Sequence, residues 1–147
     1  MNPALDGCGV IWYSPLVPMK ADRVRVYVDM VKKICIQHQM EPLITLTSLA
    51  HRCFDSTVPI LFDPEDPEET SRAHDCYKAL YEGGKKEGFL PYRVGIDHME
   101  LVTRSNSVFW NLVSKLKHAL DPDGILAPGR YCPLNKDNMA YTDVRED

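Results

Sequence analysis

The chain has 147 residues, of which 44% are hydrophobic and 26% are charged, with a formal net charge of -4 at pH 7. These values are ordinary for a soluble globular protein and allow one domain with a real core. No Lys/Arg stripe runs along an expected face, so nucleic acid is not an expected partner. No apolar run approaches the roughly 20 residues of a membrane span, and no signal peptide pattern opens the chain.

The cysteines occur singly, without a C-x-x-C pair, at Cys8, Cys35, Cys53, Cys76 and Cys132. An odd number at such spacing argues against a disulfide framework, so we expect reduced thiols that pack as small apolar groups. The nearest approach to metal-ligand spacing is His51 with Cys53, which has no further ligands nearby, so no metal site is expected.

The first expected strand and helix lie close together near the start of the chain. Residues 9–13 form a β-type run, and Ser14-Pro15 is expected to stop it. Over residues 22–39, apolar side chains recur at three- and four-residue spacing. That period predicts an amphipathic helix, and Asp22 is placed to cap its start.

Three further strands are expected. Residues 42–49 alternate apolar and hydroxyl side chains, which is typical of a half-buried strand. Residues 57–62 are a second short β-type run, and residues 89–94 predict a third. The last of these contains the pair Tyr92-Arg93.

The second expected helix has the clearest local signal in the chain. Asp66 is placed to cap the helix, Pro67 suits the first helical position, and Glu69 is placed to reach back to the Asp66 amide. An apolar stripe follows, and Gly88 suits the end of the helix. We therefore expect a helix over residues 67–87.

A third helix is expected from about Ser107 to Leu120. Its expected buried side comprises Phe109, Leu112, Val113, Leu116 and Leu120. A turn that begins at Asp121 stops this helix. Beyond Cys132 the chain is polar, and residues 133–147 are expected to form a mobile tail.

The order of elements is β-α-β-β-α-β, followed by a helix and an irregular tail. It predicts an α+β fold of the ferredoxin-like, split βαβ type, with an antiparallel sheet and both helices on one of its faces. The sequence contains no P-loop, G-x-G-x-x-G or G-x-S-x-G pattern, so these common motifs indicate no chemistry here.

Two segments are unusual for their place in the chain. Residues 125–131 combine apolar side chains, a rigid Pro128-Gly129 corner and Arg130. Taken alone they are typical of a turn between a helix and a tail, with apolar side chains at the edge of a core. Tyr92-Arg93, also taken alone, is more typical of an exposed ladder pair than of a functional site.

Three segments in order resemble the C-terminal region of the vanillyl-alcohol oxidase and 4-cresol dehydrogenase (p-cresol methylhydroxylase) flavoprotein family. They are residues 66–73 (Asp-Pro-Glu-Glu-Thr-Ser-Arg-Ala), the Tyr92-Arg93 pair and residues 120–130 (Leu-Asp-Pro-Asp-Gly-Ile-Leu-Ala-Pro-Gly-Arg). An aromatic pair followed by Ser-Pro at residues 12–15 fits the same family. The similarity extends from about residue 8 to 131 and is most specific in its last segment.

This resemblance implies a two-part enzyme that oxidises para-substituted phenols. A separate FAD-binding domain, in the same or another chain, holds the FAD. Residues 1–147 form the C-terminal cap domain of this FAD-linked oxidase, which covers the substrate. The substrate binds as a phenolate, its benzylic carbon gives a hydride to flavin N5, and a quinone methide forms. The chain alone is expected to be inactive, and the full enzyme is expected to be a homo-oligomer that passes electrons to oxygen or to a cytochrome c.

The resemblance also assigns roles to three residues. Tyr92 matches the tyrosine that hydrogen-bonds the phenolate oxygen, and Arg93 matches the arginine between that oxygen and the flavin N1/O2 edge. Arg130 matches the basic residue of the Pro-Gly-Arg turn, also near that edge. Fixed guanidinium groups suit such a site, because phenolate and reduced flavin are both anionic. The candidate catalytic residues are therefore Tyr92 and Arg93, and the candidate cofactor-binding residues are Arg93 and Arg130.

The sequence departs from the family in two places. Residues 9–11 (Gly-Val-Ile) stand where vanillyl-alcohol oxidases carry a flavin-linking His, so a histidyl bond from this region is absent. Residues 54–56 (Phe-Asp-Ser) stand where relatives have a His-His pair, so a substrate other than a simple alkylphenol fits. The alternative function is a non-catalytic ferredoxin-like module for a small ligand or a partner chain, or an inactive fragment of such an enzyme. The reading frame upstream would separate these hypotheses.

Overall fold

The computed structural model describes residues 7–49, 51–103 and 108–132, and the chain falls into two compact units. The first unit, up to Val94, contains β1 (Gly9–Tyr13), β2 (Leu16–Pro18), α1 (Ala21–Gln37), β3 (Thr45–Ser48), β4 (Cys53–Phe62) and α2 (Pro67–Glu87). The second, from Gly95, contains η1 (Ile96–His98), α3 (Met99–Thr103) and α4 (Val108–Leu120). The predicted tail over residues 133–147 lies outside the described residues. No described helix combines the length and apolar character needed to cross a membrane.

β4 is the central strand of a four-stranded antiparallel sheet. β1 and β2 pair with one side of β4 in a single register, in which Tyr13 lies opposite Val58 and Leu16 lies opposite Asp55. β3 pairs with the other side of β4. The Pro15 carbonyl accepts the Ser56 N–H at 3.1 Å, but Pro15 has no N–H with which to return the bond. The predicted strand over residues 9–13 and its end before Ser14-Pro15 are therefore confirmed. Pairing with β4 resumes after Pro15 as β2, a strand that the sequence did not indicate.

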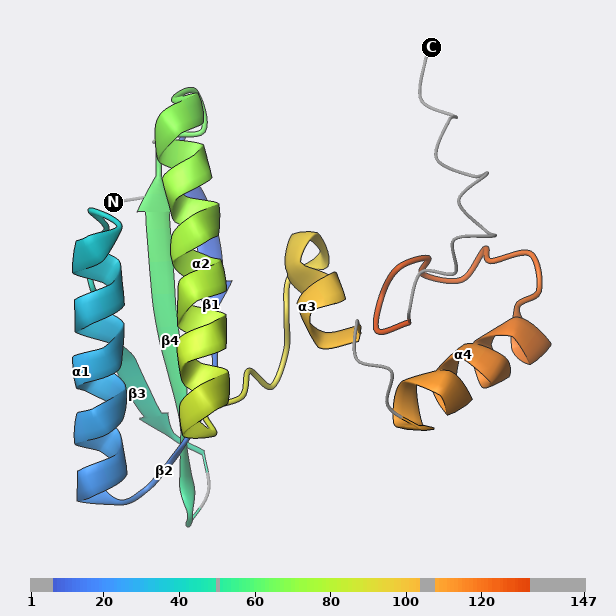
Figure 1. The fold of residues 1–147 in the computed structure, drawn as a ribbon, viewed down its shortest axis with the longest axis horizontal. Coiled ribbons are helices and arrows are strands. Elements are labelled where there is room, and N and C mark those ends of the chain that lie inside the picture. The colour runs from blue at the N-terminus through green and yellow to red at the C-terminus, as the bar shows by residue number, and fades with distance from the viewer. Residues whose placement is uncertain (1–6, 50, 104–107, 133–147) are drawn as a thin grey trace. The chain divides into compact units, whose positions relative to one another are not determined.

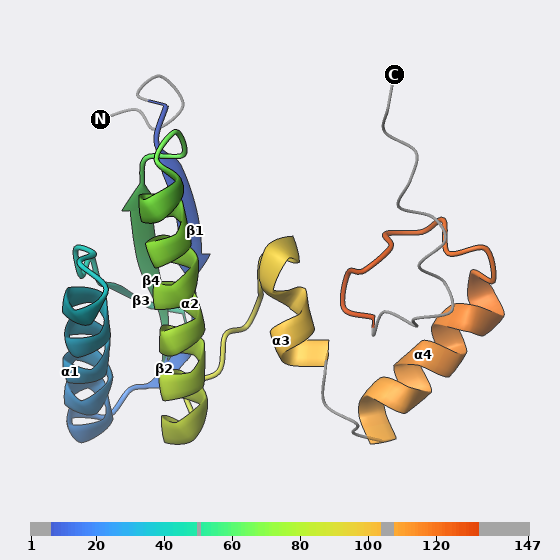
Figure 2. The same cartoon turned by 45° about the horizontal axis from the view of Figure 1, so that its top comes forward.

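Both long helices, α1 and α2, lie on the same face of the sheet (Figure 1), and the turned view agrees (Figure 2). They run antiparallel, because Arg23 near the start of α1 pairs with Glu87 at the end of α2 at 3.5 Å. Farther along, Gly83 of α2 lies beside Met30 and Ile34 of α1. The predicted fold class, an α+β ferredoxin-like arrangement with both helices on one face, is confirmed.

The core lies between this sheet face and the two helices. Its largest fully buried side chains include Tyr13, Tyr27, Tyr77, Phe89, Ile60 and Leu80. The Tyr27 hydroxyl and Ser56 Oγ are hydrogen-bonded at 2.7 Å, which satisfies two polar groups inside this apolar layer. Cys35 and Cys76 are free thiols with no exposed surface, as predicted for small apolar packing groups. The free thiols of Cys8, Cys53 and Cys132 are only partly buried.

The strand predicted over residues 89–94 is wrong in extent, because only a bridge between Pro91 and Pro15 forms there. The Leu16 N–H donates to the Leu90 carbonyl at 3.0 Å, and the Tyr92 N–H donates to the Ser14 carbonyl at 3.2 Å. Pro91 itself has no N–H to continue a ladder, and the backbone bends directly after it. The segment still occupies the edge position that the ferredoxin-like order requires.

The other two predicted strands differ from the structure at their ends. β3 begins at Thr45 rather than at residue 42, because the backbone at Glu41 and Leu43 forms a local turn. β4 begins at Cys53 rather than at residue 57. Its additional residues pair with both β2 and β3, and long-range pairing of this kind leaves little trace in a single sequence.

The predicted cap of α1 is wrong. Lys20 occupies the N-cap position and makes no side-chain cap hydrogen bond. Asp22 lies inside the first turn, where its negative charge favours the positive end of the helix dipole without capping a backbone N–H. The helix ends at Gln37, two residues before the predicted end at residue 39.

The predicted cap of α2 is confirmed in its main part. Asp66 accepts hydrogen bonds from the backbone N–H groups of Glu68 and Glu69, at 2.8 and 3.2 Å. The predicted return bond from the Glu69 side chain to Asp66 is absent, because Glu69 Oε2 accepts the Asp63 N–H instead. Gly88 ends the helix with φ of 81°, a left-handed conformation that glycine adopts without strain.

The second unit contains one predicted helix and two short ones, η1 and α3, that the sequence did not indicate. α4 begins one residue after the expected position and ends at Leu120 as predicted. Its predicted buried side is wrong, since Phe109, Leu112 and Leu116 are each more than half exposed and Leu120 is 81% exposed. Within its unit α4 is accompanied by short helices and a turn, which are too small to cover a long apolar side.

Candidate functional site

The face of the sheet opposite α1 and α2, called here the open face, carries large apolar side chains in contact with solvent. Residues opposite each other in antiparallel strands share a face. Tyr13 and Val58 face the helices and are fully buried, so Trp12, one position from Tyr13, faces the other way. Leu16, three positions from Tyr13, shares the face of Trp12. The exposed large side chains on the open face are Val10, Trp12, Leu16, Leu90 and Tyr92. A contiguous apolar surface of this kind is typical of a binding surface.

Tyr92 and Arg93 lie together at the edge of the open face. The hydrogen bond from the Tyr92 N–H to Ser14 fixes Tyr92 opposite Ser14, and its side chain is 45% exposed. The Arg93 guanidinium lies 5.6 Å from the centroid of the Tyr92 ring, within reach of a cation–π interaction. The structure therefore places the Arg93 cation at the Tyr92 ring, beside apolar side chains.

Asp55, an acidic residue, also lies on the open face. It lies opposite Leu16 of β2 and opposite Thr47 of β3, so the three side chains share the open face. Asp55 Oδ1 is shielded from solvent and has no hydrogen-bond partner among the described residues. The sequence marked Asp55 only as a departure from the resembled family, because its orientation depends on the strand register.

Arg130 belongs to the second unit, which is described by itself. The turn before it is built on Asp121, whose carboxylate accepts the N–H groups of Ile125 and Leu126 at 2.9 Å each and pairs with Lys117. The Lys117 hydrogen bond holds the pKa of Asp121 below its usual range, and the two backbone N–H groups act in the same direction. Arg130 is exposed. Sequence reasoning missed this role of Asp121, although an Asp before a Gly turn is the signal for it.

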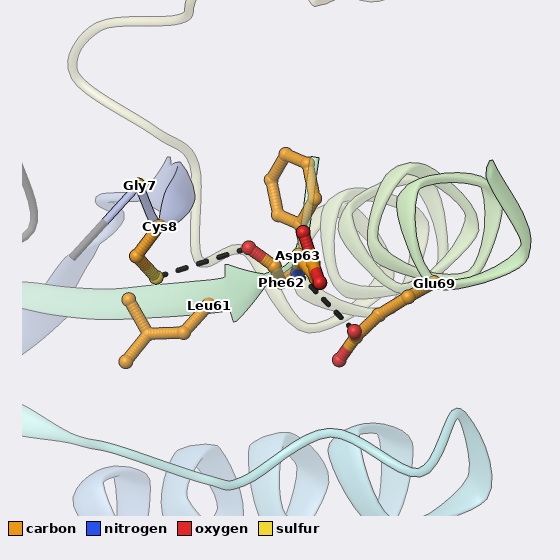
Figure 3. Close-up of a pocket in the computed structure, with 6 residues that line it drawn as sticks. All are labelled: Gly7, Cys8, Leu61, Phe62, Asp63 and Glu69. Atoms are coloured by element: carbon orange, nitrogen blue, oxygen red, sulfur yellow. Dashed lines mark hydrogen bonds between the residues drawn. The ribbon is translucent and has the colours of Figure 1, made fainter. Parts of the chain in front are cut away.

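The structure also has a shallow pocket at the far end of β1 and β4 (Figure 3). It has a volume of about 360 Å³ and is lined by Gly7, Cys8, Leu61, Phe62, Asp63 and Glu69. Cys8 Sγ donates to the Phe62 carbonyl, and the Glu69 carboxylate accepts the Asp63 N–H (Figure 3). None of the three predicted site residues lines this pocket. In the described ranges no group of three His, Cys, Asp or Glu residues could hold a metal ion.

Comparison with known proteins gives matches over most of the chain. Residues 21–131 match the family described as FAD linked oxidases, C-terminal domain. The chain is 38% identical over 130 residues to 1'-carboxy-chondrochloren decarboxylase of Chondromyces crocatus, which covers 88% of this chain and 24% of that protein. It is 30% identical over 125 residues to the 4-cresol dehydrogenase [hydroxylating] flavoprotein subunit of Pseudomonas putida, covering 84% and 24%. The chain thus spans about a quarter of the length of these relatives.

Solved structures agree with the fold. The crystal structure of p-cresol methylhydroxylase with substrate bound superposes with a TM-score of 0.78 at 30% identity, covering 84% of this chain and 24% of that one. The 4-ethylphenol oxidase of Gulosibacter chungangensis, in its isoeugenol complex, gives a TM-score of 0.80 at 23% identity, covering 89% and 26%, and supports the fold alone. The family description implies that the full enzyme uses FAD. The chain belongs to the family of FAD linked oxidases, C-terminal domain, and is related to phenol-oxidising flavoproteins.

Proposed function

We propose that this chain forms the substrate-covering wall of an FAD-dependent oxidoreductase that oxidises para-substituted phenols. The observation that carries the proposal is the open face, where Tyr92 and the Arg93 cation lie beside exposed apolar side chains. An aromatic ring can pack on Trp12 and Leu16, while the Tyr92 hydroxyl donates a hydrogen bond to the phenolate oxygen. The Arg93 guanidinium stabilises the negative charge of that oxygen.

The N-terminus of α2 does not suit the phosphate-binding part of an FAD site. A helix N-terminus favours phosphate when it is free of acidic groups. The first turn of α2 carries Glu68 and Glu69 after the Asp66 cap, and these charges would repel phosphate. We therefore include in the proposal a separate FAD-binding domain, in the same or another chain. Arg93 and Arg130 are the residues of this chain that would stabilise negative charge on the cofactor.

When bound, FAD supplies an acceptor for a hydride from the benzylic carbon of the substrate. Loss of that hydride converts the phenolate into a neutral quinone methide, which gains water or loses a proton to give the product. Arg93 favours the ionised substrate before this step, and Tyr92 orients the ring through its oxygen. Oxygen or a cytochrome c is the proposed final electron acceptor, in a homo-oligomeric enzyme.

A second candidate function is oxidative removal of a carboxyl group from a related substrate. It is favoured by the 38% identity to a protein named as a decarboxylase. Both candidates place an aromatic substrate on the open face. They differ in the charge of the group at the end of the substrate far from the phenol oxygen.

The proposal is tested by replacing Arg93 in the full FAD-containing protein. Loss of one preorganised charge donor typically costs about 2.7–4 kcal/mol, so Arg93→Ala should reduce its flavin about 10² to 10³ times more slowly with 4-methylphenol under anaerobic stopped-flow conditions. Arg93→Lys should recover only part of the rate, because an ammonium cannot span two acceptors as a planar guanidinium does. Tyr92→Phe should have a smaller effect, since Arg93 still meets the phenolate.

A matched control is Arg25→Ala, which removes an exposed arginine from α1 on the opposite side of the sheet. Its flavin reduction rate should equal that of the wild type. A wild-type rate for Arg93→Ala would limit the resemblance to the fold, and the roles proposed for Tyr92 and Arg93 would be withdrawn.

A further inference from the structure

Asp55 is the feature of the open face that the proposed reaction does not use. Its Oδ1 atom is inaccessible to solvent and accepts no hydrogen bond from the described residues. The neighbouring positions in the sheet are Leu16, on one side, and Thr47, on the other. The side chain is half-buried rather than enclosed in the core, so it borders the same surface as Tyr92.

An acceptor that is shielded from water and has no donor is unfavourable, and more so when it is charged. Folded proteins leave few such atoms without a structural or functional reason. The helix-facing side of the same strand shows the contrast, because the neighbouring Ser56 is fully buried and is hydrogen-bonded to Tyr27. Asp55 Oδ1 thus lacks the kind of partner that the Ser56 hydroxyl has. Rotation of this half-buried carboxylate toward the open face would present the oxygen to a ligand donor.

The register places Asp55 at a useful distance from Tyr92. Asp55 lies opposite Leu16, while Tyr92 lies opposite Ser14 on the other side of the same strand. Two strand spacings across and two residues along correspond to about 12 Å between their Cα atoms. Leu16 and Leu90 lie between them and are both exposed. An aromatic body with a short side chain fits across such an apolar gap, with one polar end at each residue.

We propose that Asp55 determines substrate specificity by accepting a hydrogen bond from a hydroxyl or ammonium group on the para side chain of the phenol. This inference rests on the proposed function, because it assumes that the phenol oxygen lies at Tyr92. A carboxylate in the same place is disfavoured, because it brings a second negative charge against Asp55 and offers no donor. The substrate class is therefore a para-substituted phenol with a neutral or cationic hydrogen-bond donor on its side chain.

The test measures binding to the full FAD-containing protein by titration calorimetry, with three phenols that differ at one end. The probes are 3-(4-hydroxyphenyl)propan-1-ol, its isostere 4-butylphenol, and 3-(4-hydroxyphenyl)propanoate. The wild type should bind the alcohol about tenfold or more tightly than 4-butylphenol, as expected for a hydrogen bond to a charged group. The propanoate should bind most weakly.

Two variants separate the role of Asp55 from a general effect on folding. Asp55→Asn keeps the shape and should weaken the preference for the alcohol while improving propanoate binding. Asp55→Leu removes the unsatisfied acceptor, so the preference for the alcohol should vanish while the melting temperature stays the same or rises. Asp63→Asn, at the far end of the sheet beyond β4, is the matched control and should keep all three affinities.

The outcomes distinguish this inference from the proposed function. If none of the three phenols binds, the proposed function is overturned together with the inference. If they bind and Asp55→Asn keeps the wild-type order of affinities, the inference alone is overturned. A wild type that binds the propanoate most tightly also overturns it and favours the decarboxylase candidate.

Discussion

Gly84 of α2 lies against Tyr13 of β1, and replacing it with alanine should destabilise the first unit. A Cβ atom there would overlap Tyr13 Oη and would lie 2.7 Å from the Phe89 carbonyl oxygen. Neither neighbour can move easily. The Tyr13 ring is fully buried and packs edge-on against Tyr77, and the Phe89 N–H is hydrogen-bonded to the Gly84 carbonyl.

The expected magnitude follows from two opposing effects. Overpacking a rigid site costs about 1–3 kcal/mol, and contact with backbone belongs at the upper end of that range. Alanine is favoured over glycine in a helix interior by about 1 kcal/mol. The net loss in the free energy of unfolding for Gly84→Ala should therefore be about 2 kcal/mol. A lower urea midpoint at an unchanged m-value, followed by circular dichroism of the purified chain, would measure it.

Gly83→Ala is the matched control in the same helix. Its Cβ would meet Ile34 Cδ1 at 3.0 Å and Met30 Sδ at 3.3 Å, which are ends of flexible side chains that can adjust. The helix preference for alanine should then offset the crowding, and the stability should change by less than about 1 kcal/mol. If Gly84→Ala were as stable as Gly83→Ala, the close approach of α2 to Tyr13 and Phe89 would be wrong.

Two further predictions concern polar groups outside the proposed site. Ser56→Ala should cost about 1–3 kcal/mol in urea unfolding, because it leaves the buried Tyr27 hydroxyl without its partner. The double variant with Tyr27→Phe should cost less than the sum of the single variants; strict additivity would show that the two hydroxyls do not interact. In the second unit, Lys117 lowers the pKa of Asp121, so the stability that this carboxylate contributes is complete above roughly pH 4, the unfolded value, and is lost as the pH falls through the lower folded value. The Ile125 amide resonance should report this acid transition, and Asp121→Asn should abolish it; a transition that persists in the variant would assign it to another group.

Features encoded by a few adjacent residues could be predicted from the sequence. The Asp66-Pro67 pair gives the start of α2 because capping depends on neighbouring backbone N–H groups. The three- and four-residue spacing of apolar side chains predicted α1 over nearly its full length. The features that the sequence did not predict depend on distant partners. β2 forms because β4 also pairs with the residues after Pro15. The side of α4 expected to be buried is exposed, because no described residues of its own unit cover it.

The candidate site could be predicted only in part, and for a related reason. Tyr92 and Arg93 were selected by the family resemblance, since nothing in their local sequence separates them from an exposed ladder pair. The structure adds that they lie beside the apolar open face. The position of Asp55 on this face depends on the pairing of β4 with β2 and β3. A shift of one residue in that register would turn its side chain toward the helices.

The pairing of Pro91 with Pro15 has a consequence for the solution behaviour of the protein. The Leu90 carbonyl accepts the Leu16 N–H, and the Tyr92 N–H donates to the Ser14 carbonyl, so both bonds point into the sheet. Because successive residues of a strand point their backbone groups in opposite directions, those of Pro91 point outward from the sheet. At that position a different residue would present a free N–H to any extended segment from another molecule. Proline presents none, and this edge therefore lacks the donor on which strand-by-strand aggregation would begin.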